Sequence, residues 1–194
     1  MSNNKKIILD LCGGTGAWSK PYKDNGYDVR VITLPDNDVF TYIPPNNVYG
    51  ILAAPVCTMF SLARTRAKTP RDLREGMRMV IACLNIIWEC RYNNKLAFWS
   101  LENPMGYLRQ FLGKPVLTFN PCDYGDPYTK KTDLWGYFTI PKQSSINLNK
   151  EQEDLCKINN RKLPSISDFT GSKQKARRAV TPQGFAKAFY KANK

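Results

Sequence analysis

The stretch KKIILDLCGGTGAWS, residues 5–19, decides the fold that the sequence predicts. Its apolar run ends in three closely spaced glycines, Gly13, Gly14 and Gly16. Glycines let a backbone take positive φ angles and approach a ligand closely. We therefore expect a strand, a glycine turn and a helix, the turn being either a tight connection or a binding loop. It is not a dinucleotide-binding loop, since Ser19 stands where the last glycine of that pattern belongs.

Strand-like and helix-like segments alternate through the rest of the chain. This alternation predicts an α/β fold with a mainly parallel sheet covered on both faces, closed by a late antiparallel hairpin. We expect one domain over residues 1–194, with 142–176 as a short polar insert. Ligands of such sheets bind beyond the carboxyl ends of the strands. The predicted strands lie within 5–11, 26–35, 46–54, 95–104, 114–125 and 132–140, and the predicted helices over 70–92, 105–112 and 181–193.

The charge of the chain is unusual. Its 29 Lys and Arg exceed its 16 Asp and Glu, giving a formal net charge of +13, with basic clusters at 63–78, 129–132 and 171–178. This balance suits a polyanion such as nucleic acid, although a solvated basic surface would have the same composition.

The cysteines and the lack of histidine narrow the chemistry further. The six cysteines form no Cys-x-x-Cys pair, so we expect neither a zinc site nor disulfides. Without histidine, proton transfer must use other side chains or water. No apolar run reaches the length of about 20 residues that a membrane span needs. We therefore expect a cytoplasmic protein with neither a metal nor a membrane partner.

Two further strand ends carry reactive side chains. In GILAAPVCTMFSLAR (50–64), Cys57 follows an apolar strand and precedes arginines, which would favour a thiolate that adds to an electron-poor ring carbon. The alternative is a core cysteine. Glu102 ends the next buried strand, where it could carry a proton or cap a helix beside Pro104. A cysteine and a glutamate on neighbouring strand ends suit addition across the double bond of a pyrimidine.

Together these motifs resemble the catalytic domain of the DNA cytosine carbon-5 methyltransferases. DLCGGTGAW (10–18) is similar to the first cofactor motif of that family, and APVCTMFSLAR (54–64) resembles its Pro-Cys nucleophile loop. LENP (101–104) resembles its Glu-Asn-Val motif, and YGDPYTKKTDLW (124–135) matches the register of its Gln-x-Arg-x-Arg motif. The resemblance covers residues 6–141 and, by topology, the terminal helix.

The resemblance implies a Rossmann-like methyltransferase fold that uses S-adenosylmethionine and acts on DNA. It implies that Cys57 adds to carbon 6 of a flipped cytosine and that Glu102 hydrogen-bonds or protonates ring nitrogen 3, while carbon 5 takes the methyl group. Lys130 or Lys131 would stand in for a supporting arginine. The implied cofactor residues are Asp10, Leu11, Cys12, Gly14, Gly16, Trp18, Thr33, Asp38 and Pro55. The implied substrate residues are Ser61, Arg64, Arg66, Asn103, Pro104 and Tyr128.

The sequence also departs from the family pattern. Val56, Thr58 and Pro104 replace residues usual in its motifs, and residues 142–176 are too few for a separate target-recognition domain. We therefore expect a compact, phage-like enzyme of low sequence specificity, to which a protein partner or a second copy could add recognition. Three alternatives stay open: the same chemistry on RNA, single-stranded DNA or a free nucleotide; a catalytically silent nucleic-acid-binding protein; and a carboxylated analogue of the cofactor.

Overall fold

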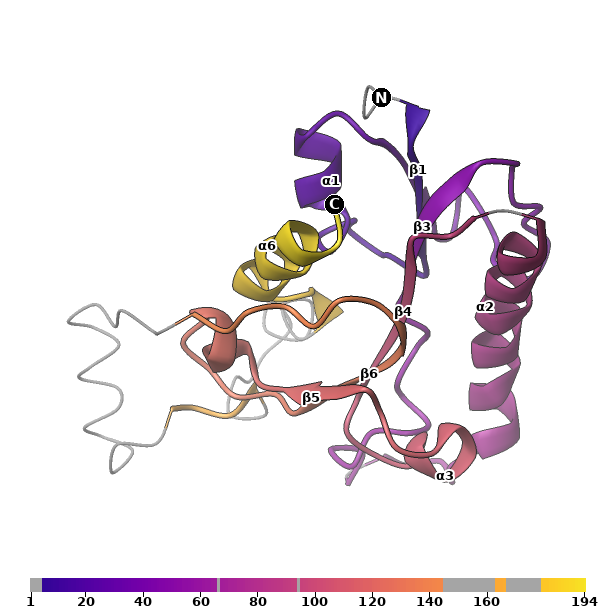
Figure 1. Ribbon diagram of the computed structural model, residues 1–194. Helices are drawn as coiled ribbons and strands as arrows, with labels where there is room; N and C mark the ends of the chain where they lie inside the picture. The colour runs from indigo at the N-terminus through magenta and orange to yellow at the C-terminus, as the bar shows by residue number, and fades with distance from the viewer. Residues whose placement is uncertain (1–4, 66, 94, 145–162, 167–178) are drawn as a thin grey trace.

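A computed structural model describes residues 5–65, 67–93, 95–144, 163–166 and 179–194 (Figure 1). Arg66 and most of the predicted polar insert lie outside these residues. The described part of the chain contains one six-stranded sheet in the order β2-β1-β3-β4-β6-β5. Its strands are β1 (Ile7–Leu11), β2 (Asp28–Ile32), β3 (Val48–Ala53), β4 (Phe98–Pro104), β5 (Leu117–Phe119) and β6 (Thr132–Tyr137). The helices are α1 (Lys20–Asp24), α2 (Leu73–Asn93), α3 (Arg109–Leu112), η2 (Pro121–Tyr124, a 3₁₀ helix) and α6 (Gln183–Ala192).

The sheet is mixed, with most of its strands parallel. Strands β2, β1, β3 and β4 pair in parallel, whereas β6 runs antiparallel to both β4 and β5. The predicted α/β class and the late antiparallel hairpin are therefore confirmed. The helix predicted after the glycine turn is also present, although it does not start directly at the turn. Turns extend through Ser19, and the short helix α1 begins only at Lys20.

Both faces of the sheet are covered by helices. Leu9 and Leu11 of β1 face α2, where Val80 and Ile87 complete one core cluster. Ile8 faces the opposite side and belongs to the second cluster, formed with residues of α1 and α6. Figure 1 shows α2 on one side of the sheet and α1 with α6 on the other. This two-sided burial explains why the central strands β1 and β3 are mostly apolar in the sequence, whereas the edge strand β2 is not.

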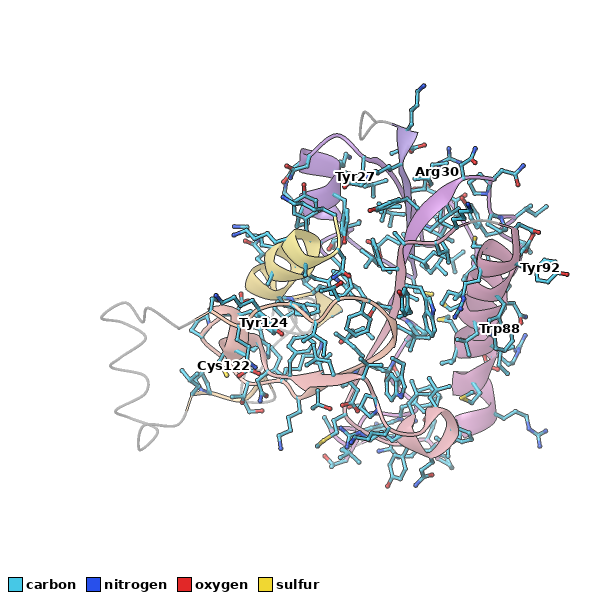
Figure 2. The ribbon with its side chains drawn as sticks, viewed as in Figure 1. Tyr27, Arg30, Trp88, Tyr92, Cys122 and Tyr124 are labelled. Carbon is cyan, nitrogen blue, oxygen red and sulfur yellow. The ribbon has the colours of Figure 1, made fainter. Side chains whose placement is uncertain are left out.

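The C-terminal helix is fixed by contacts to distant parts of the chain. Phe185 of α6 stacks on Phe119 with ring centroids 4.0 Å apart. Tyr124 of η2, labelled in Figure 2, packs edge-on against the Phe185 ring. The carboxylate of Asp126 accepts a hydrogen bond of 2.9 Å from the Gly184 amide in the first turn of the helix. Helix α6 therefore covers, together with the five-residue helix α1, the face of the sheet opposite α2.

Candidate functional site

The sheet register brings three predicted loops to one edge. In the parallel pairing, Leu11 lies opposite Ala53, and Ala53 lies opposite Leu101. The glycine turn after β1 and the cysteine segment after β3 therefore leave the sheet at the same edge. Glu102 lies at this edge too, one residue beyond the last pairing of β4 with β3, although β4 itself continues to Pro104 alongside β6. Strand β6 runs the other way, so its starting residue Thr132 pairs with Pro104 at this same edge.

The Asp10 side chain lies beneath the glycine turn and supports it. It is fully buried, and its Oδ2 accepts a hydrogen bond of 2.5 Å from the Ser19 hydroxyl. Its Oδ1 has no hydrogen-bond partner among the described residues. Burial raises the pKa of this carboxyl group from 3.8 to about 6. A Cβ atom at Gly13 would collide with the Asp10 carboxyl group, so glycine is required there.

The turn itself has the backbone geometry that its glycines predict. Gly14 and Gly16 have φ angles of 55° and 69°, and a Cβ atom at Gly14 would meet open space. Cys12 also has a positive φ of 56°, which is uncommon for a residue with a side chain. The turn is thus partly exposed above a buried carboxyl group.

Cys12 links this turn to helix α2. Its Sγ lies 3.9 Å from Sγ of the buried Cys83, and neither cysteine forms a disulfide. The hydrogen bond from Cys83 lowers the pKa of the Cys12 thiol, against the opposing effects of burial and of the nearby Asp10 and Asp38 carboxylates. Asp38 is therefore close enough to Cys12 for its charge to act on the thiol. Its own Oδ1 accepts a hydrogen bond from the Phe40 amide.

Cys57 begins a tight turn over residues 57–61, which we call the Cys57 turn. The Cys57 carbonyl accepts hydrogen bonds of 2.9 Å from the amides of Phe60 and Ser61. The Cys57 side chain is half-buried and forms no disulfide. Pro55, which precedes the turn, is buried, and its carbonyl accepts a hydrogen bond of 3.0 Å from the side chain of the buried Asn103. The cysteine segment is thereby tied to the strand end that carries Glu102.

Glu102 meets the loop that leads into β6. Lys130 Nζ lies 3.7 Å from Glu102 Oε1, and the two side chains are only 14% and 15% exposed. Tyr128 is near the same carboxylate: burial, and then the Asp126 and Glu102 charges, raise the pKa of its phenol to about 12. Pairing of β6 with β4 therefore brings the segment 124–135, which was compared with the Gln-x-Arg-x-Arg motif, to the Glu102 carboxylate.

Not every predicted residue presents its side chain at this edge. Leu11 and Trp18 are buried in the core, where Trp18 packs against Phe185 and Phe189, so their side chains offer no surface to a ligand. Lys131 is exposed, in contrast with Lys130.

The other predicted residues that the structure describes lie around this edge of the sheet. Thr33 directly follows β2, and Pro104 ends β4. The Arg64 guanidinium donates a hydrogen bond of 2.7 Å to the Thr69 hydroxyl, and Ser61 Oγ accepts one from the Ala63 amide. The predicted substrate residue Arg66 lies outside the described residues.

Three residues that hold the Cys57 turn were not expected from the sequence. Arg71 donates to two carbonyl groups of the turn, the Tyr107 amide donates to a third, and Gly106 pairs with Ser61 in a short antiparallel bridge. A Cβ atom at Gly106 would collide with the Phe60 carbonyl oxygen. Gly106 lies two residues after Pro104 of the Glu-Asn-Pro segment, and this glycine was the one available signal in the sequence.

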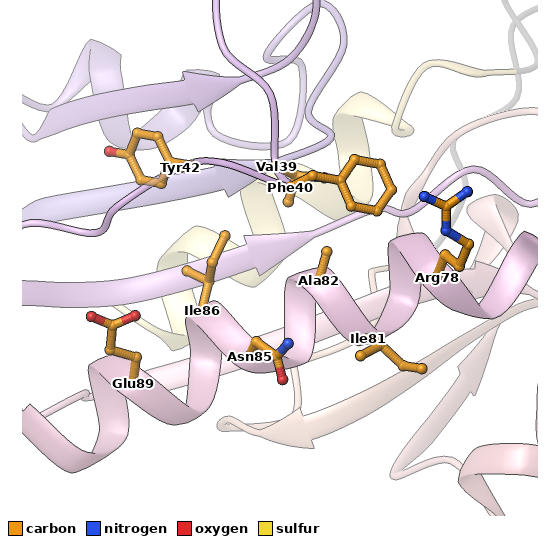
Figure 3. A pocket seen from close by; sticks show the side chains of 9 residues that line it. All are labelled: Val39, Phe40, Tyr42, Arg78, Ile81, Ala82, Asn85, Ile86 and Glu89. Atoms are coloured by element: carbon orange, nitrogen blue, oxygen red, sulfur yellow. The ribbon is translucent and has the colours of Figure 1, made fainter.

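A separate groove of about 360 Å³ lies between the loop at residues 39–42 and helix α2 (Figure 3). Arg78 and Phe40 lie toward one end of it and Glu89 toward the other. None of the residues expected at the site lines this groove. The groove therefore belongs to the flank of α2, and the candidate site is the strand-end cluster.

Comparison of the chain with protein-family models and with curated proteins finds no match. Within the described ranges, no group of three or more His, Cys, Asp or Glu side chains could hold a metal ion. No helix in the same ranges is long and apolar enough to cross a membrane. The geometry of the strand-end cluster is therefore the basis for the function proposed next.

Proposed function

We propose that the protein transfers a methyl group from S-adenosylmethionine to carbon 5 of cytosine in nucleic acid, most favourably DNA, through a covalent adduct of Cys57. The observation that carries this proposal is the convergence of the Cys57 turn, Glu102 and Lys130 at one sheet edge. A nucleophile beside a carboxyl group with its own cation is the set of groups that addition to a pyrimidine ring requires.

The glycine turn fits the proposed cofactor. Asp10 has a buried oxygen without a hydrogen-bond partner in the described region, and a side chain at Gly14 would meet open space. Asp38 is close to Cys12 on the neighbouring loop. These residues would hold S-adenosylmethionine, which when bound supplies an electrophilic methyl group. Leu11 and Trp18 would contribute through the packing that fixes the turn.

The chain's own groups account for activation of the base. The Cys57 thiolate forms a bond to carbon 6 of the cytosine, and the electron pair of the ring double bond moves toward carbon 5. Glu102, held by Lys130, donates a hydrogen bond or a proton to ring nitrogen 3 and so makes the ring more electrophilic. Once carbon 5 carries the methyl group, the cofactor would be left as its neutral thioether, S-adenosylhomocysteine. Loss of the carbon 5 proton to water or a base then expels Cys57 as a thiolate and restores the double bond, and any proton on nitrogen 3 returns to Glu102.

The positive net charge of the chain favours a polymeric nucleic acid over a free nucleotide as the substrate. The chain has a net charge of +13. Phosphate contacts by such a surface would supply sequence-independent affinity that weakens with salt. A base inside a duplex would have to be flipped out to reach Cys57.

The test is incubation with tritiated-methyl S-adenosylmethionine and separate samples of double-stranded DNA, single-stranded DNA, RNA and cytidine nucleotides. Nucleosides are then resolved by mass spectrometry. We expect label in 5-methylcytosine from DNA and its loss in Cys57→Ala. Cys122→Ala is the matched control, because Cys122 is also half-buried but belongs to η2.

The outcomes separate the alternatives. Label in RNA or in the nucleotide pool, but not in DNA, would keep the chemistry and change the substrate. Binding of S-adenosylmethionine and nucleic acid with no transfer to any sample would leave a binding protein and refute the transferase. A trap with 5-fluorocytosine DNA gives a second readout, because fluorine at carbon 5 blocks the elimination that releases Cys57.

A further inference from the structure

Arg71, just before helix α2, makes the most specific contacts to the Cys57 turn. Its guanidinium donates hydrogen bonds of 2.9 Å to the Met59 carbonyl and 2.8 Å to the Ser61 carbonyl. The planar fork of arginine can reach two acceptors at once, whereas lysine is a point charge. Hydrogen bonds from a charged donor are about twice as strong as neutral ones.

The opposite side of the turn is also held. The Tyr107 amide donates a hydrogen bond of 3.0 Å to the Phe60 carbonyl, which lies between the two carbonyls that Arg71 binds. The Arg71 guanidinium lies 4.8 Å from the centroid of the Tyr107 ring, so the two groups that hold the turn also contact each other. Three successive carbonyl groups of the turn are therefore bound from outside it.

We propose that Arg71 is a positioning residue that fixes the Cys57 turn and thereby sets the direction of the thiol toward the base. The proposal rests on the transferase function proposed above and assigns Arg71 no contact with substrate. The two hydrogen bonds of the Arg71 guanidinium both go to backbone carbonyls of the turn. An arginine that binds phosphate would instead direct these N–H groups toward the nucleic acid. A small error in the position of a reacting group can reduce rates by about 100-fold.

The experiment compares Arg71→Ala and Arg71→Lys with Arg91→Ala, which removes the same charge from an exposed position at the far end of α2. We expect the kcat of Arg71→Ala to fall by about 10- to 100-fold with little change in KM for DNA. Arg71→Lys should recover part of this loss, and Arg91→Ala should behave like the wild type. Thermal unfolding of each variant establishes that it is folded.

A second measurement does not depend on activity. The amides of Phe60 and Ser61 bond to the Cys57 carbonyl, so their hydrogen exchange reports on the turn. Loss of charged hydrogen bonds should speed their exchange by about 10-fold in Arg71→Ala, with the amides of β1 unchanged. If the wild type transfers no methyl group, the proposed function fails while this measurement still tests the positioning role.

Two results would overturn the proposal. One is unchanged exchange at Phe60 and Ser61 in a folded Arg71→Ala variant. The other is a raised KM with unchanged kcat and a reduced salt dependence of DNA binding, which would make Arg71 a phosphate contact.

Discussion

The ammonium nitrogen of Lys130 lies 3.7 Å from Oε1 of Glu102, although 28 positions separate the two residues. The contact follows from strand pairing, since β6 begins at Thr132 opposite Pro104 at the end of β4. Both side chains are largely withdrawn from water, so desolvation offsets much of their attraction. We infer that the pair contributes more to the orientation of the Glu102 carboxyl group than to stability.

The first prediction concerns this pair. Lys130→Met keeps the length of the side chain but removes its cation, and we expect methyl transfer to fall by about 100-fold, as when a charge-stabilising donor is lost from an active site. Lys131→Met is the control, because Lys131 is exposed and only its backbone carbonyl bonds to the site, through the Met105 amide. The measurement is kcat/KM with tritiated S-adenosylmethionine. Equal losses in the two variants would mean that both lysines act only through the overall charge.

The second prediction compares two adjacent glycines. Gly13→Ala would place a Cβ atom against the buried Asp10 carboxyl group and should cost about 2 to 3 kcal/mol. In Gly14→Ala the new Cβ atom would meet open space, so the only expected loss of stability is about 1 kcal/mol from the positive φ angle. Urea unfolding gives both values, and calorimetry gives the affinity for S-adenosylmethionine. A larger cost at Gly14 would contradict this geometry of the turn.

Much of this edge could be predicted because its signals are local. Apolar runs predict the strands, and the carboxyl ends of parallel strands meet at one edge of the sheet. This rule places Cys57, which follows β3, and Glu102, which lies in the last part of β4, at the same edge. Arg71 could not be found this way, because its bonds go to backbone carbonyls and leave no side-chain pattern. Trp18 looked like part of a binding motif but is buried against α6, since a large aromatic ring after a turn can serve the core equally well.

The third prediction concerns an ion pair that the sequence did not indicate. Arg109 donates two hydrogen bonds of 2.6 Å to the fully buried Asp133. Among the described residues, Arg109→Ala would leave that carboxylate with the Thr118 hydroxyl as its one side-chain hydrogen-bond donor, and it should cost about 2 kcal/mol. The control is Lys20→Ala, whose partner Asp24 is exposed and whose loss should cost less than about 0.5 kcal/mol. Equal costs by urea unfolding would show that burial of Asp133 does not determine the energy.

The fourth prediction is the pH dependence that Asp10 gives to stability. Its pKa is about 6 in the folded protein and near 3.8 in the unfolded chain, so between these pH values the folded state holds the extra proton. The contribution of Asp10 to the free energy of unfolding therefore falls as pH rises from about 4 to 6. Above pH 6 this contribution is constant. The difference in pKa corresponds to about 3 kcal/mol.

Asp10→Asn tests this sign, because asparagine keeps an acceptor for the Ser19 hydroxyl but does not titrate. Its stability relative to the wild type should rise between pH 4 and 6, so that the variant is the more stable protein at pH 7. Binding of S-adenosylmethionine should weaken in the same variant if the free Asp10 oxygen serves the cofactor. A pH-independent difference in urea unfolding would mean that Asp10 does not titrate in this range. If Asp10→Asn is more stable at pH 7 and binds S-adenosylmethionine more weakly, the buried Asp10 carboxylate lowers the stability of the folded protein and contributes to cofactor binding.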